Sequence, residues 1–112
     1  MLDLRDFNQF AEYIPDLWFN DGKEVSVQLK CATIPNIQKE IRDQVGINPD
    51  KVADMNHSFI AKHVGEIKGL SVGGVPIKSF DDLLERGPSE LYSWISTVVY
   101  SSQRLDRAEI KN

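Results

Sequence analysis

A broad apolar face with helical spacing is the feature that most constrains the fold of this chain. The apolar residues of this face recur at positions i, i+3, i+4, i+7 and i+8: Leu91, Trp94, Ile95, Val98 and Val99. That spacing is typical of an amphipathic helix, and a face this wide has to be buried against other elements. The sequence therefore predicts a core helix that starts after Gly87-Pro88 and ends near Tyr100.

Two further helices are predicted in the middle of the chain. The first is capped by Thr33 or a neighbour, ends at Gly46, and has a narrow apolar stripe: Ile34, Ile37, Ile41 and Val45. The second starts at Asn48-Pro49, an N-cap residue followed by proline at the first helical position. We expect Gly65 to end it, after an apolar face made of Val52, Met55, Phe59, Ile60, His63 and Val64.

Two shorter helices are predicted nearer the ends of the chain. Near the N-terminus, apolar residues recur at helical spacing from Asp3, a capping residue, to Ile14, and Pro15 then stops the helix. Farther along, Ser79 caps a helix that has Asp82 at its third position, which is an acidic variant of the capping box.

Strand signals are fewer and shorter. Residues 24–30 alternate polar and apolar side chains, which predicts a strand whose apolar side faces the core: Val25, Val27, Leu29 and Cys31. Asp21-Gly22 is a turn signal before this strand, and residues 17–19 are its expected hairpin partner. Gly73-Gly74 predicts a second tight hairpin, in which Pro76 keeps its strand short or at an edge.

Together these elements predict an α+β fold that is mainly α-helical, with four or five helices and one or two small β-hairpins. The chain has 112 residues, a common single-domain size that allows one hydrophobic core. Residues 1–112 are therefore expected to form one domain, with a polar, flexible end at residues 101–112. A parallel doubly wound sheet is excluded because it needs several more strand–helix repeats.

The composition favours a soluble protein of a reducing compartment. One cysteine, Cys31, excludes an internal disulfide. The longest uncharged stretch in the C-terminal half, residues 91–103, is rich in hydroxyl groups and too short to span a bilayer. No basic start followed by an apolar run marks a secretory signal.

Acidic and aromatic residues concentrate in residues 1–21, which we call the N-terminal arm. The arm has five acids and one base, Arg5, and so accounts for the net charge of −4. It also holds half of the aromatic residues: Phe7, Phe10, Tyr13, Trp18 and Phe19. Its negative charge repels phosphate, which argues against nucleic acid or a membrane surface as a partner. We expect the arm to contact a protein or, as the favoured alternative, to dock on the chain's own core.

No combination of a nucleophile, a base and an orienting group is visible in the sequence. His57 and His63 are six residues apart, a spacing that does not place them on one helix face, so no metal site is expected. We expect His63 to be packed on an apolar face, His57 to be exposed, and Cys31 to be buried. The chain is therefore expected to have no cofactor and no catalytic activity; a small enzyme with a dispersed site is the remaining enzymatic alternative.

The order of motifs from Gly22 to Asn112 resembles that of the tail assembly chaperones of long-tailed, siphovirus-type bacteriophages. The shared pattern starts with a strand after Gly22-Lys23 and continues with helices and a glycine–hydrophobic pair, Gly69-Leu70. Next come Gly74-Val75-Pro76-Ile77, an acidic leucine-containing helix, Pro88, an amphipathic helix and a Lys-Asn ending. Relatives often have a tryptophan shortly before the middle glycine, where this chain has Ile67.

The resemblance implies a non-catalytic protein of the host cell cytoplasm that is absent from the mature virion. Such a protein would bind the tape measure protein, keep it soluble, and recruit subunits of the tail tube protein. The resemblance also implies self-association and a longer product made by ribosomal frameshifting. Ile110-Lys111-Asn112 can be encoded by a slippery heptamer, A-AAA-AAC, although all three amino acids have other codons.

Aromatic residues expected at the surface are the candidate partner-binding residues: Phe7, Phe10, Trp18, Tyr92 and Tyr100. The two tyrosines flank the predicted core face of the last long helix, and the other three belong to the N-terminal arm. Surface aromatic side chains contribute most of the energy of many protein interfaces. Two other interaction classes fit the same features, namely a head–tail completion protein and a secretion-type chaperone.

Overall fold

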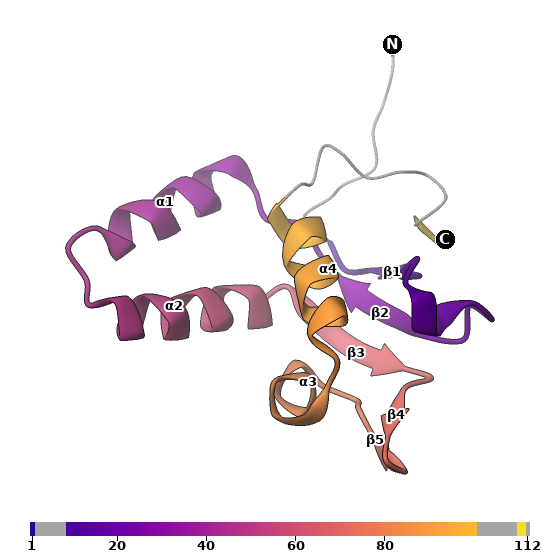
Figure 1. Ribbon diagram of the computed structural model, residues 1–112. Coiled ribbons are helices and arrows are strands. Elements are labelled where there is room, and N and C mark those ends of the chain that lie inside the picture. Colours follow the sequence, from indigo (N-terminus) through magenta and orange to yellow (C-terminus); the bar gives the residue numbers. More distant parts are fainter. Residues whose placement is uncertain (2–8, 101–109, 112) are drawn as a thin grey trace.

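The computed structural model describes residue 1, residues 9–100 and residues 110–111. Within these residues, four α-helices and six short strands form an α+β arrangement (Figure 1). All six strands pair in antiparallel fashion: four form one sheet, in the order β3-β2-β1-β6, and two form a separate hairpin, β4-β5. The α+β class expected from the sequence is therefore present, together with a sheet that the sequence did not predict.

β2 (Ser26–Leu29) lies inside the larger sheet and carries much of its buried surface. Val27 and Leu29 are fully buried, as the alternation of residues 24–30 predicts. β1 (Ala11–Tyr13) pairs with one side of β2, and β3 (Val64–Lys68) pairs with the other. β6 (Ile110–Lys111) pairs with the outer side of β1.

The expected N-terminal helix is wrong over its last residues, because Ala11–Tyr13 form β1 instead. The expected start of that helix, including Asp3 and Phe7, lies outside the described residues. Tyr13 is 1% exposed, and its hydroxyl lies 3.7 Å from Cys31 Sγ. The strand therefore buries a large aromatic side chain in the core, which a helix ending at the surface would leave in water.

The expected hairpin partner of β2 is also wrong. Residues 17–19 do not pair with β2, because Trp18–Asn20 form a single 3-10 turn, η1. The side chain of Asn20 takes the place of strand pairing at this point. It donates to the carbonyl oxygens of Pro15 and Val25 at 2.8 and 3.1 Å, and it accepts from the Val25 amide at 2.8 Å.

α1 (Ile34–Gln44) and α2 (Pro49–Ala61) start where the sequence predicts. The Thr33 hydroxyl accepts from the Asn36 amide, and the Asn48 side chain accepts from the Asp50 amide. The predicted end of α2 is wrong, since residues 64 and 65 belong to β3. Pairing with β2 explains the early end, because the backbone groups of residues 64–68 bond to the strand ladder and not to a continued helix.

The remaining elements follow their local signals. β4 (Ser71–Val72) and β5 (Val75–Pro76) form the predicted hairpin, in which Gly73 and Gly74 have φ values of +58° and +84°. Such angles suit a tight hairpin turn and favour glycine. Ser79 caps α3 (Phe80–Arg86) by accepting from the Asp82 amide.

α4 (Ser89–Tyr100) packs across the sheet as the core helix that its apolar period predicts (Figure 1). Leu91, Ile95 and Val99 are fully buried, and the carbonyl oxygen of Val99 accepts from the Ala32 amide at 2.8 Å. The core lies between α4 and the sheet, with Phe59 and Ile60 of α2 closing one side. We call the sheet together with α4 the body. α1 and α2 form a helical hairpin that extends from the body (Figure 1).

The described part of the N-terminal arm belongs to this body. Tyr13, Pro15 and Asn20 are buried, while Phe10 and Trp18 stay exposed. At the other end, the expected flexible segment falls on residues 101–109 and 112, which lie outside the described residues, and on β6. No helix among the described residues has the length and apolar character needed to cross a membrane.

Candidate functional site

Most of the apolar stripe of α1 is exposed to water. Four residues form it, and we call them the α1 face: Ile34, Ile37, Ile41 and Val45. Ile34, Ile41 and Val45 are 55%, 60% and 76% exposed, and only Ile37 is partly buried. Among the helices of the described residues, α1 alone contains no buried residue. A stripe of this width, with spacings of three and four residues, fits one further helix better than a protein core.

Polar contacts hold α1 in position, with Ile37 as the one residue of the stripe that packs against the core. The Gln44 side-chain amide donates to Glu40 Oε1 at 2.9 Å and, across the hairpin, to Asn56 Oδ1 of α2 at 2.6 Å. An exposed ion pair between Lys39 and Asp43, at 2.7 Å, lies along the same helix and contributes little to stability. These contacts hold α1 beside α2 while the apolar stripe stays in contact with water.

A cleft of about 360 Å³ continues the α1 face toward the body. It opens between α1, α2 and α4, and residues of all three helices line it: Ile37, Ile41, Asn56, Ile60, Tyr92 and Tyr100. The sequence-predicted candidates Tyr92 and Tyr100 thus lie together on one surface. That surface also includes Ile37 and Ile41, which the sequence analysis assigned to a helix stripe and not to a binding site.

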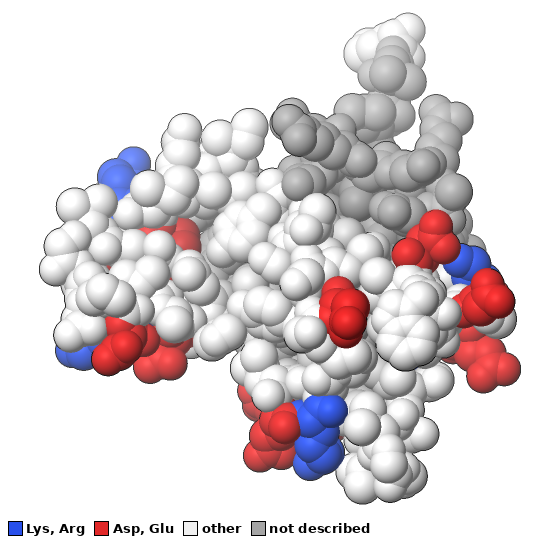
Figure 2. Space-filling view, viewed as in Figure 1, with Lys and Arg blue, Asp and Glu red and all other residues white. Residues whose placement is uncertain are grey.

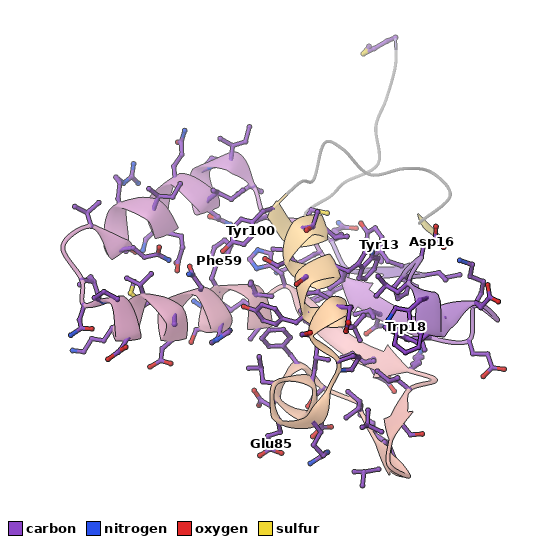
Figure 3. All side chains as sticks on the ribbon, in the orientation of Figure 1. Tyr13, Asp16, Trp18, Phe59, Glu85 and Tyr100 are labelled. Atoms are coloured by element: carbon purple, nitrogen blue, oxygen red, sulfur yellow. The ribbon has the colours of Figure 1, made fainter. Side chains whose placement is uncertain are left out.

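Both tyrosines of the cleft are held in place by aromatic neighbours. Tyr100 stacks on Phe59 with ring centroids 5.5 Å apart (Figure 3), and Tyr92 stacks on Phe80 at 5.8 Å. The Tyr92 hydroxyl also lies 2.9 Å from His57 Nδ1. His57 is therefore half-buried and hydrogen-bonded, and the expectation that it is exposed is wrong. Burial raises the pKa of both tyrosines, so they remain neutral at physiological pH.

The other sequence-predicted binding residues lie elsewhere. Phe7 falls outside the described residues. Phe10 is 50% exposed, and the ammonium group of Lys30 lies 5.2 Å from the centre of its ring. Trp18 is 78% exposed and lies beyond α4 from the α1–α2 hairpin (Figure 3). The structure therefore brings Tyr92 and Tyr100 together and leaves Phe10 and Trp18 apart from them.

The two side chains with potential for catalysis, His63 and Cys31, are both buried. His63 is 4% exposed, and its Nδ1 atom lies 2.8 Å from the carbonyl oxygen of Phe59. Burial lowers the pKa of His63, and the nearby charges of Lys30 and Lys62 lower it further. Cys31 is buried beside the Tyr13 hydroxyl. Across the described part of the chain, no three His, Cys, Asp or Glu side chains lie close enough to hold a metal ion.

The sequence carries a signal for the α1 face, although its spacing by itself predicts only a helix. α4 has a broad apolar face and is buried, whereas α1 has a strict, narrow stripe and is not. The width of the stripe was the available signal, because a helix that joins a globular core needs a wider one. The arrangement is suited to binding an apolar helix surface and offers no group for covalent chemistry.

Comparisons with protein-family models, with curated proteins and with solved structures each found no match. Function is therefore inferred from the exposed surface, the cleft and the motif order. Of these, the α1 face is the feature that the fold uses least, because only Ile37 of its four residues packs against the core.

Proposed function

We propose that this protein is a tail assembly chaperone of a long-tailed bacteriophage, which binds the tape measure protein and assists assembly of the tail tube without catalysis. The motif order from Gly22 to Asn112 supports the proposal through its resemblance to that family. In this role the protein acts in the host cell cytoplasm, is absent from the mature virion, and is accompanied by a longer product of ribosomal frameshifting.

The observation that carries the proposal is the uncovered α1 face. Ile34 and Ile41 lie on one side of a helix whose position is set by polar contacts, so the stripe is free to receive a partner. An amphipathic helix binds such a surface by laying its own apolar stripe along it. Full burial of one isoleucine side chain contributes about 1.5–3 kcal/mol. A long helical protein such as a tape measure protein offers many such stripes.

The cleft adds aromatic contacts beside the α1 face. Tyr92 and Tyr100 are rigid because each stacks on a phenylalanine, so binding costs little additional side-chain entropy. A partner side chain that enters the cleft would contact ring surface and the polar edge formed by Ser96 and Asn56. Rigid aromatic side chains of this kind are frequent anchors of protein interfaces.

Co-expression tests this function directly. The partner is the product of the very long, helix-rich reading frame expected downstream of this gene. We expect the wild-type protein to keep that product in the soluble fraction and to co-purify with it. Ile41→Asn places a polar amide in the middle of the α1 face and should lower the recovered partner about tenfold, the loss expected of an interface anchor.

Leu84→Asn is the matched control. Leu84 is 44% exposed on α3, outside the α1 face and the cleft, so the same loss of apolar surface there should leave the recovered partner unchanged. Equal recovery with Ile41→Asn and wild type would show that the α1 face is not the binding surface. Stable presence of the protein in purified phage particles would contradict the chaperone role and favour a head–tail completion protein.

A further inference from the structure

A second hollow lies on the other side of the body from the α1–α2 hairpin. It has a volume of about 670 Å³. One side is formed by η1 and the turn that follows it, and the other side by the start of the β4–β5 hairpin. We call it the Trp18 groove, and its main lining residues are Trp18, Phe19, Glu24, Gly69, Val72 and Arg86. Its volume is in the range of sites that hold a ligand or a short peptide segment.

The exposed indole of the groove is held in place. Trp18 is 78% exposed, although it contacts Phe19 edge-to-face with ring centroids 5.6 Å apart. Its 3-10 turn ends at Asn20, which is 2% exposed and makes three hydrogen bonds to the backbone of Pro15 and Val25. Trp18 is therefore a large, preorganised aromatic surface in water, which is the arrangement of an interface anchor.

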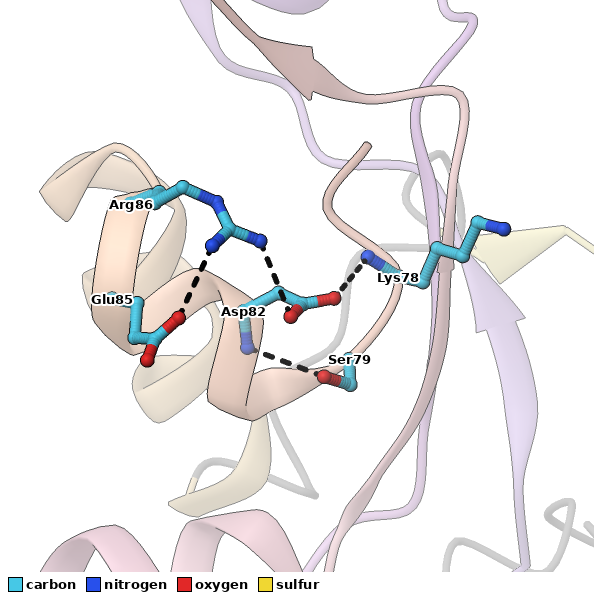
Figure 4. Close-up of polar contacts among 5 residues, drawn as sticks. All are labelled: Lys78, Ser79, Asp82, Glu85 and Arg86. Carbon is cyan, nitrogen blue, oxygen red and sulfur yellow. Dashed lines mark hydrogen bonds and ion pairs between the residues drawn. The ribbon is translucent and has the colours of Figure 1, made fainter. Parts of the chain in front are cut away.

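Two charged residues line the groove, and they differ in whether another charge already pairs with them. Arg86 is already paired with two carboxylates, Glu85 at 3.1 Å and Asp82 at 3.4 Å (Figure 4). Glu24 is exposed, and its carboxylate has no hydrogen bond or ion pair with any described residue. The nearby cation Lys23 is paired with Asp16 at 2.7 Å. The free charge of the groove is therefore negative, and acidic side chains gather on this side of the surface (Figure 2).

One wall of the groove is an open strand edge. β4 pairs only with β5 within the described residues, so its other edge has no strand beside it. Ser71 and Val72 of β4 line the groove and are exposed. An extended peptide can add to such an edge through its main chain, while its side chains enter adjacent pockets.

We propose that the Trp18 groove binds an extended segment of a partner protein that carries an arginine or lysine side chain. The main chain of the segment lies along β4, and its cationic side chain lies between the Trp18 indole and the Glu24 carboxylate. Tryptophan attracts cations through the face of its ring, and Glu24 supplies the opposite charge. The site shares no residue with the α1 face, so it stands or falls independently of the proposed chaperone function.

The test is a titration of the isotope-labelled full chain, followed by NMR. The probe is acetyl-Gly-Val-Arg-Val-Gly-amide, and its matched partner has citrulline, which is uncharged, in place of arginine. We expect the arginine peptide to shift the indole N–H signal of Trp18, identified by its loss in Trp18→Phe, together with the amides of Ser71 and Val72. Binding should weaken about fivefold with citrulline or in the Glu24→Gln variant, and it should also weaken at high salt.

Asp54→Asn is the control for net charge, because Asp54 is an exposed acid on α2, away from the groove. It should bind the arginine peptide like wild type. Equal affinity for the citrulline and arginine peptides would overturn the proposal. So would an unchanged affinity of Glu24→Gln, peptide-induced shifts confined to other elements, or the absence of shifts at millimolar peptide.

Discussion

His63 shows how a single buried residue links stability to pH. Burial, and then the charges of Lys30 and Lys62, lower its pKa, while the hydrogen bond to the carbonyl oxygen of Phe59 opposes this shift. The unfolded chain therefore binds a proton near the ordinary histidine pKa of about 6.5, and the folded chain resists protonation until a lower pH. The contribution of His63 to stability is complete above the unfolded pKa and is lost as the pH falls below it.

We expect the free energy of unfolding in urea to fall between about pH 7.5 and about pH 5.5, the interval in which histidine titrates. His63→Gln lacks the titrating group, so its free energy of unfolding should change less over that interval, whatever its stability at neutral pH. An equal change in the variant and the wild type would assign the pH dependence to other groups.

Trp18 and Asn20 show which features of single residues cannot be predicted from the sequence. Trp18 could be identified as an aromatic candidate, but its exposure depends on Asn20, whose three backbone hydrogen bonds join segments on both sides of the Asp21-Gly22 turn. A buried asparagine that replaces strand pairing has no local sequence pattern. The exposed aromatic candidates of the arm could therefore be named in advance, whereas the groove around Trp18 could not.

At the scale of elements, α1 and α4 should respond differently to the same substitution. Ile95 on α4 is fully buried and Ile41 on α1 is 60% exposed. Ile95→Ala should lower the free energy of unfolding by about 2–5 kcal/mol because it leaves a cavity in the core. Ile41→Ala removes little buried surface and should cost less than about 1 kcal/mol. Chemical denaturation of both variants measures the difference, and similar losses would place α1 in the core.

Elements defined by neighbouring residues could be predicted from the sequence, and those defined by distant pairing could not. The caps at Thr33, Asn48 and Ser79 and the Gly73-Gly74 turn are local signals, and each is present in the structure. β1 and β3 exist because both pair with β2, whereas local periodicity predicts a helix for the residues of β1 and for the first two residues of β3. Strand pairing between segments far apart in the chain overrides such weak periodicity.

At the scale of the whole molecule, the body and the α1–α2 hairpin have different surfaces. The body buries its apolar residues between α4 and the sheet, whereas the hairpin presents the α1 face to water. An uncovered apolar stripe of this kind favours association with a second stripe, whether on a partner or on another copy of the chain. Self-association and partner binding would then use the same residues and compete with each other.

This competition gives the last prediction. Without a partner, the wild-type protein should associate as its concentration rises, and sedimentation velocity should show a growing fraction of larger species. Ile41→Asn should lower that fraction because a buried amide without a hydrogen-bond partner disfavours the apolar contact, while Leu84→Asn should behave like wild type. Adding an equimolar amount of the partner recovered in the co-expression test should convert the larger species into a complex that holds one copy of each chain. Larger species that persist in Ile41→Asn, or that bind the partner without dissociating, would place self-association on another surface and leave the α1 face to the partner alone.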